Sequence, residues 1–125
     1  MGSRRIVTVE ILSYIPTLNE YINAERRHRL RAARLKRTTE KQITLELIGQ
    51  KIKPFDSIFL SYNWIRQHRR EDKDNISFGQ KFVQDALMLA GIITNDGWNK
   101  VVGFSHDFNV DKEQGPKLIL SIEER

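Results

Sequence analysis

Two aspartates separated by a single residue, Asp72 and Asp74, are the side chains whose spacing most clearly suggests chemistry. In an extended or turning backbone, alternate side chains point to the same side, so both carboxylates can converge on one cation. Two carboxylates about 4 Å apart repel by roughly 4 kcal/mol at an effective dielectric constant near 20, and a bound divalent ion turns that repulsion into attraction. The chain has no Cys and only three isolated His, so oxygen ligands favour Mg²⁺, with Mn²⁺ as a substitute, over zinc.

Simpler interpretations of these acids remain open. Asp74 or Asn75 can cap the helix that follows, which leaves Asp72 in solvent. A third acid, Asp96, lies in the turn Asn95-Asp96-Gly97 and approaches the same site if the next strand pairs beside the preceding one. Asp before Gly is also an ordinary turn residue. Spacing alone therefore does not decide between a metal site and a helix cap.

Positive charge is concentrated in the first part of the chain. Residues 1–53 carry 12 basic and 5 acidic side chains, whereas residues 75–125 carry 5 basic and 7 acidic ones. Eight basic residues fall within 16 positions: Arg26, Arg27, Arg29, Arg31, Arg34, Lys36, Arg37 and Lys41. This density favours a polyanionic partner such as nucleic acid. The alternative is a solvated helix face with no partner.

The composition excludes several classes of protein. The 125 residues predict one domain, 1–125, with an ordinary soluble composition. The absence of Cys excludes disulfides, thiolate metal sites and thiol nucleophiles, and agrees with a cytoplasmic location. No apolar run approaches the ~20 residues of a membrane helix, no signal peptide is expected, and Gly2-Ser3 is typical of a cloning remnant.

The elements that must position the acids follow from residue periodicity. Strands are predicted at 4–15, 57–65, 98–108 and 117–122 from alternating or β-branched residues. Helical composition covers 18–47, with Thr38-Thr39 as an N-cap that divides it, although 42–48 also alternates as a strand does. A helix is predicted from Ile76 to Ala90, ended by Gly91. The fold class is therefore α/β (α+β), a β-α-β-α-β-β mixed sheet with helices packed on it.

One run of residues resembles a known family. Residues 69–76 (RREDKDNI) are followed by Lys81, by Asp85-Ala86-Leu87, by Ala90-Gly91-Ile92 and by residues 95–98 (NDGW), after an early Pro16-Thr17-Leu18-Asn19 element. These motifs resemble the RusA family of Holliday junction resolvases, particularly its bacteriophage-borne members. The resemblance covers most of the chain and implies a RusA-like fold.

The resemblance also implies roles for individual residues. Asp72, Asp74 and Asp96 would bind the metal, and Lys81 would be the catalytic lysine, about one helical turn later than in the best-known member. Asn75 and Asp85 would hold the metal ligands in place. Hydrolysis of a phosphodiester needs an activated water and compensation of the charge that develops, and a carboxylate-held Mg²⁺ supplies both.

The implied activity is Mg²⁺-dependent cleavage of branched DNA, such as four-way junctions, by paired nicking as a homodimer. No membrane and no small-molecule cofactor are expected. The expected DNA contacts are basic residues of the first helix and of the acidic motif, the segment 69–74 that contains Asp72 and Asp74: Arg26, Arg27, Arg29, Arg34, Arg37, Arg69, Arg70 and Lys73. The alternatives are a non-catalytic basic DNA-binding module and a general metal-dependent nuclease. Trp64 and Trp98 are expected in the core, and no role is predicted for any His.

Overall fold

The computed structural model describes residues 4–125, in which the elements follow the order β-α-α-β-α-α-β-β. The strands are β1 (Ile6–Ile11), β2 (Ile58–Arg66), β3 (Val101–Val110) and β4 (Lys117–Glu124). The helices are α1 (Leu18–Arg27), α2 (Arg29–Gly49), α3 (Lys73–Ser77) and α4 (Gln80–Leu89). Within this range, none of the helices is long and apolar enough to cross a membrane. The cloning remnant predicted at Gly2-Ser3 lies outside the described residues.

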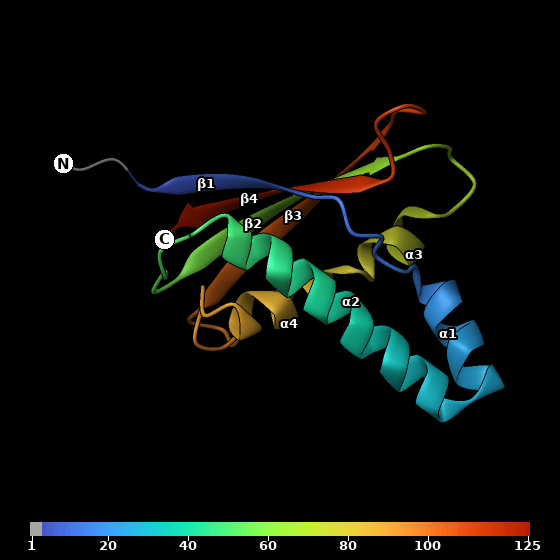
Figure 1. Ribbon diagram of the computed structural model, residues 1–125. Helices are drawn as coiled ribbons and strands as arrows, with labels where there is room; N and C mark the ends of the chain where they lie inside the picture. The colour runs from blue at the N-terminus through green and yellow to red at the C-terminus, as the bar shows by residue number, and fades with distance from the viewer. Residues whose placement is uncertain (1–3) are drawn as a thin grey trace.

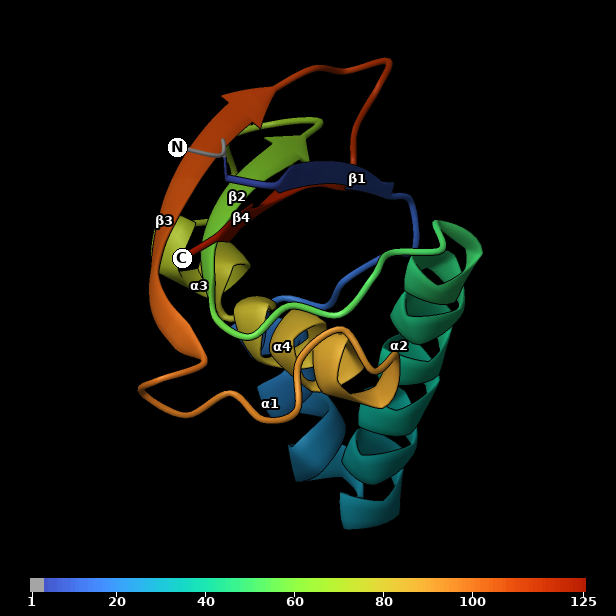
Figure 2. The ribbon, with the colours of Figure 1, turned by 90° about the vertical axis from the view of Figure 1, so that its left-hand side faces the viewer.

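The strands form one mixed sheet in the order β1-β4-β2-β3. β4 pairs antiparallel with both β1 and β2, whereas β2 and β3 are parallel. The helices lie against one face of the curved sheet (Figures 1 and 2). The predicted mixed sheet with helices packed on it is therefore confirmed at the level of fold class.

The hydrophobic core fills the space between this face of the sheet and the helices. Alternation along β2 buries Ile58, Leu60, Tyr62 and Trp64. β4 adds Leu118, Leu120 and Ile122, and the helices add apolar side chains such as Ile43, Leu47, Phe82, Val83 and Leu87. Trp64 thus lies in the core, as predicted. Trp98 does not, because it is 95% exposed in the loop before β3, and the prediction for it was wrong.

The first helical region divides at His28 rather than at Thr38-Thr39. Thr17 and Glu20 form a capping box that starts α1. His28 has an extended backbone, and its Nδ1 accepts a hydrogen bond from the Leu30 N–H at 3.1 Å, which caps α2. α2 then continues without interruption through Thr38-Thr39, where Thr39 is buried. The predicted break at these threonines, and the strand alternative for 42–48, were therefore wrong.

The second helical region is also two helices, because the chain comes very close to the sheet between them. A Cβ built on Gly79 would lie 2.5 Å from Cγ2 of Ile15 and 3.0 Å from the Trp64 ring. Only glycine fits this close approach. At the far end, Gly91 has φ +74° and ends α4 as predicted.

Candidate active site

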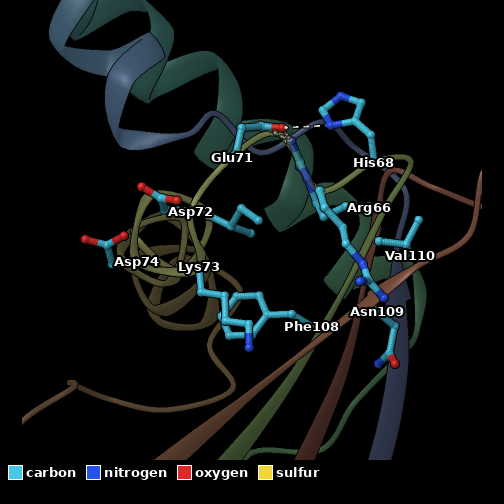
Figure 3. A pocket seen from close by; sticks show the side chains of 11 residues that line it. Arg66, His68, Glu71, Asp72, Lys73, Asp74, Phe108, Asn109 and Val110 are labelled. Atoms are coloured by element: carbon cyan, nitrogen blue, oxygen red, sulfur yellow. Dashed lines mark hydrogen bonds and ion pairs between the residues drawn. The ribbon is translucent and has the colours of Figure 1, made fainter.

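Asp72 and Asp74 lie at the start of α3, where the chain returns from the end of β2. Asp72 is the N-cap residue of α3, yet its side chain makes no capping hydrogen bond. Asp74 Oδ1 accepts a hydrogen bond from the neighbouring Asn75 N–H at 3.0 Å. Both residues are exposed, and Figure 3 shows the two carboxylates on the same side of α3. Both side chains therefore share one side of the helix, the side away from Lys73 and Phe108, and neither caps the helix by a side-chain hydrogen bond.

The pair borders a pocket of about 620 Å³ between α3 and the end of β3. Its lining combines acidic, basic and apolar side chains: Arg66, His68, Arg69, Glu71, Asp72, Lys73, Asp74, Ile76, Phe108, Asn109 and Val110. Arg69 and Lys73 are exposed, whereas Arg66 is only 9% exposed. Of the predicted DNA contacts, Arg69 and Lys73 therefore line the pocket, and Arg70 lies outside its lining.

An ion pair fixes the loop that carries the acidic motif. The Arg66 Nη2 donates to both carboxylate oxygens of Glu71, at 2.7 and 3.1 Å. His68 lies beside the same carboxylate, 3.7 Å away, and its Nδ1 accepts a hydrogen bond from the Arg70 N–H. The partner of Glu71 is thus Arg66, the last residue of β2. A two-oxygen contact of this kind holds position as well as charge.

The loop after β3 crosses the end of β2, next to the pocket. Because β2 and β3 are parallel, both strands end at the same edge of the sheet. The Asp111 N–H donates to the Arg66 carbonyl at 2.7 Å, and Gln67 Nε2 donates to the Lys112 carbonyl at 3.4 Å. A Cβ on Gly115 would lie 2.9 Å from the Arg66 carbonyl carbon. The segment 111–116 therefore passes directly over the end of β2.

Lys73, between the two aspartates, points in a different direction from them. Its Nζ lies 5.8 Å from the centre of the Phe108 ring, and Figure 3 shows its side chain running alongside that ring. A lysine over an aromatic face is attracted by the ring quadrupole. Lys73 therefore adds positive charge to the pocket without neutralising either aspartate.

The other residues expected at the site lie elsewhere. Asp96, in the loop before β3, accepts a hydrogen bond from Gln84 Nε2 at 3.5 Å. Lys81 pairs with Asp85 at 3.3 Å within α4. Asn75 accepts a hydrogen bond from the Asn19 N–H at 2.9 Å, which ties α3 to the start of α1. None of these four lines the pocket.

The three aspartates consequently do not form one cluster in this structure. Among residues 4–125, no group of three or more His, Asp or Glu side chains lies close enough to hold a metal ion. The expected gathering of Asp96 with Asp72 and Asp74 is absent, because Asp96 lies after α4 and is hydrogen-bonded to Gln84. Three acidic residues line the pocket, and the Glu71 carboxylate is paired with Arg66, which leaves Asp72 and Asp74 without an ion pair among residues 4–125.

A chain of hydrogen bonds that the sequence did not predict leads from the core to Asp96. Trp64 Nε1 donates to His106 Nδ1 at 2.9 Å, and His106 Nε2 lies 2.9 Å from Gln80 Oε1. Gln80 then donates to Gln84 at 2.6 Å, and Gln84 donates to Asp96. Because the indole only donates, Nδ1 must accept, and the proton of the neutral ring resides on Nε2. Burial lowers the pKa of His106 against a smaller opposing effect of Asp107.

The basic residues of α1 and α2 form an exposed face. Arg26, Arg27, Arg29, Arg31, Arg34, Arg37 and Lys41 are all exposed. Within residues 4–125, none of these seven is in an ion pair. Lys36 is the exception, since it lies 3.9 Å from Asp85. The run is therefore a solvated helical surface that carries uncompensated positive charge.

Comparison with known proteins leaves the site to be interpreted from its geometry. Neither a scan against protein-family models nor a search of curated proteins finds a match to this chain.

Proposed function

We propose that the protein is a Mg²⁺-dependent endonuclease that cuts branched DNA, with a fold and activity like those of the RusA family. One observation carries the proposal: two exposed carboxylates, separated by one residue, border a pocket that is also lined by Arg69 and Lys73, neither of which is in an ion pair among residues 4–125. Carboxylates suit a hard cation, and the neighbouring cations suit the phosphates of a nucleic acid. Positive charge alone would explain binding but not the paired acids.

The donor set fits magnesium. Asp72 and Asp74 offer only oxygen atoms and have no cation in an ion pair among the described residues. Mg²⁺ is usually bound by one or two protein carboxylates together with waters and substrate phosphates, so two acids are sufficient. When bound, the ion would lower the pKa of its water and compensate charge on the phosphate oxygens. The proposal thus assigns the ion to Asp72 and Asp74.

The chain's own residues would bind and orient the DNA. Lys73 and Arg69 would contact phosphates at the pocket, and the Arg66–Glu71 pair would keep the motif loop in place. The exposed basic face of α1 and α2 would hold more distant phosphates, with the salt dependence that such contacts have. A homodimer related by a two-fold axis would present two such pockets to the two equivalent strands of a four-way junction.

A second candidate function is a DNA-binding module without catalysis. The position of Asp96 favours it, since Asp96 is hydrogen-bonded to Gln84 outside the pocket lining and adds no third aspartate to Asp72 and Asp74. A general metal-dependent nuclease differs from the first proposal only in its substrate. One set of cleavage and binding measurements separates the three functions.

The test compares Asp74→Asn with a matched control, Asp56→Asn, which removes the same charge from an exposed aspartate outside the pocket. We expect the unaltered protein to nick a four-way junction in Mg²⁺ faster than a linear duplex. Asp74→Asn should lose at least about a hundredfold in rate, because roughly 3 kcal/mol of stabilisation by the ion is removed. Its junction affinity should stay the same or increase, and Asp56→Asn should cleave normally.

Each contrary result identifies one of the other functions. Tight junction binding without cleavage in Mg²⁺ or Mn²⁺ would establish the binding module. Equal cleavage of junctions and linear duplex would establish the general nuclease. Normal cleavage by Asp74→Asn would show that the acidic pair does not hold the ion.

A further inference from the structure

One face of β3 carries a row of apolar and aromatic side chains. Val102, Phe104, His106, Phe108 and Val110 occupy alternate positions and therefore share the face that is turned toward the helices. The ring centres of Phe104 and His106 are 5.6 Å apart, and those of His106 and Phe108 are 6.3 Å apart. β3 is an edge strand of the sheet. This row is therefore an extension of the core face at the sheet's border.

The helices cover the row only in part. His106 is held by Gln80 of α4 and stacks on Tyr62 with ring centres 4.7 Å apart. Phe104 on one side of it is 51% exposed, and Val110 at the end of the strand is 43% exposed. Phe108 is partly buried and forms, with Val110, the apolar wall of the 620 Å³ pocket. An aromatic ring thus stands in the same pocket as the acidic pair.

The Phe108 ring presents its flat face to the pocket. Lys73 reaches to within 5.8 Å of the ring centre from the segment of the paired aspartates, so its side chain lies over the ring on that side. Lys73 is itself exposed, and its long side chain can move to a phosphate when another group takes its place over the ring. The pocket volume falls in the range of small-ligand sites, roughly 300–1,000 Å³.

We propose that this pocket binds one unpaired nucleotide, with its base stacked on Phe108 and its phosphate beside Lys73 and Arg69. The inference rests on the proposed function, because it takes the ligand to be a nucleic acid. It adds the part of that substrate that enters the pocket, an unpaired nucleotide. A base inside a duplex has both faces covered by its neighbours, whereas an unpaired base at a branch point or gap exposes a face that an aromatic side chain can stack on. The aromatic wall and the two cations together match a nucleotide unit better than they match a paired helix.

The experiment measures binding in EDTA, so that it does not depend on cleavage. The probes are a duplex with a short single-stranded gap that contains 2-aminopurine and the same duplex without the gap. Phe108→Leu keeps apolar volume against the core and removes the flat ring, and Phe108→Trp restores a ring. Phe104→Ala is the matched control, an aromatic residue on the same face of β3 that lies outside the pocket lining.

We expect Phe108→Leu to weaken gapped-DNA binding by about 5- to 150-fold, which corresponds to the range of base–aromatic stacking energies. It should also abolish the quenching of 2-aminopurine and leave duplex affinity unchanged. Phe108→Trp should retain both signals, and Phe104→Ala should match the unaltered protein. If Phe108→Leu binds gapped DNA normally while the unaltered protein still cleaves junctions, the inference fails and the proposed function stands.

Two other results also overturn the inference. Equal loss of gapped and duplex binding in Phe108→Leu would assign the residue a structural role. A change of oligomeric state in Phe104→Ala and Phe108→Leu, measured by sedimentation, would assign the row to an interface between two copies of the chain. If the unaltered protein binds neither DNA, the proposed function itself fails.

Discussion

Replacing Glu40 by glutamine should stabilise the protein at alkaline pH and have little effect at acid pH. Glu40 of α2 is 9% exposed and hydrogen-bonds to Asp85 of α4. Asp85 is paired with Lys81 at 3.3 Å and lies 3.9 Å from Lys36, so its carboxylate charge is compensated. Burial, and then the hydrogen bond and repulsion from Asp85, raise the pKa of Glu40 from 4.5 to about 7. Glu40 therefore keeps its proton to a higher pH than an ordinary glutamate does.

The magnitude follows from the difference between the folded and unfolded pKa. Below pH 4.5 both states bind the proton, and the hydrogen bond contributes fully. Between pH 4.5 and 7 the unfolded state releases it first, so the free energy of unfolding falls as pH rises and reaches its lower level above pH 7. The full difference corresponds to about 3 kcal/mol, and relaxation of the side chain reduces it toward about 1 kcal/mol. Glutamine mimics the protonated acid and removes this loss.

Urea unfolding at pH 5 and pH 8 provides the assay, with the buried Trp64 as the fluorescent reporter. We expect Glu40→Gln to unfold near the wild-type midpoint at pH 5 and to be about 1–3 kcal/mol more stable than wild type at pH 8. Glu25→Gln, on the exposed side of α1, is the matched control and should follow the wild type at both values. A Glu40→Gln protein that is destabilised equally at both pH values would refute the assignment of the proton.

Two further predictions concern the packing of the sheet. The lowered pKa of His106 means that the unfolded state takes up its proton first, so the free energy of unfolding should fall as pH drops below 6.5; an NMR titration of the ring that gives a pKa of 6.5 or higher would contradict this. Gly79→Ala should cost about 1–3 kcal/mol in urea unfolding, because its Cβ would meet Ile15 and Trp64. Gly49→Ala, with nothing within 4 Å of its added Cβ, should be neutral or stabilising, and equal effects of the two changes would remove the steric argument.

The strands and the fold class were predictable because they depend on local alternation. Every second residue of β2 points inward, as the alternating pattern indicates, and these residues form part of the core. Helix boundaries were less predictable. His28 and Thr38-Thr39 are both plausible caps, and the choice depends on the burial of Thr39 within α2. The break at Gly79 depends on contact with Ile15, which is distant in sequence.

The same distinction between local and distant contacts applies to the candidate site. Asp72 and Asp74 are neighbours in the chain, so their common direction followed from spacing. The link from Trp64 to His106 joins residues on two strands and requires the parallel register that sets Trp64 opposite Phe108 and Tyr62 opposite His106. Asp96 was expected beside the acidic pair through the RusA resemblance, and its position depends on the loop after α4, which no periodic pattern describes.

The two segments that leave the sheet at the ends of β2 and β3 contribute differently to the pocket. Segment 67–72 leads into the acids, whereas segment 111–116 carries none of the pocket-lining side chains and only crosses the end of β2. Lengthening or exchanging 111–116 should therefore leave the pocket-lining side chains where they are, provided that the contact with the Arg66 carbonyl is kept. A chimera carrying a foreign 111–116 segment would therefore change the surface beside the pocket and keep its carboxylates and cations.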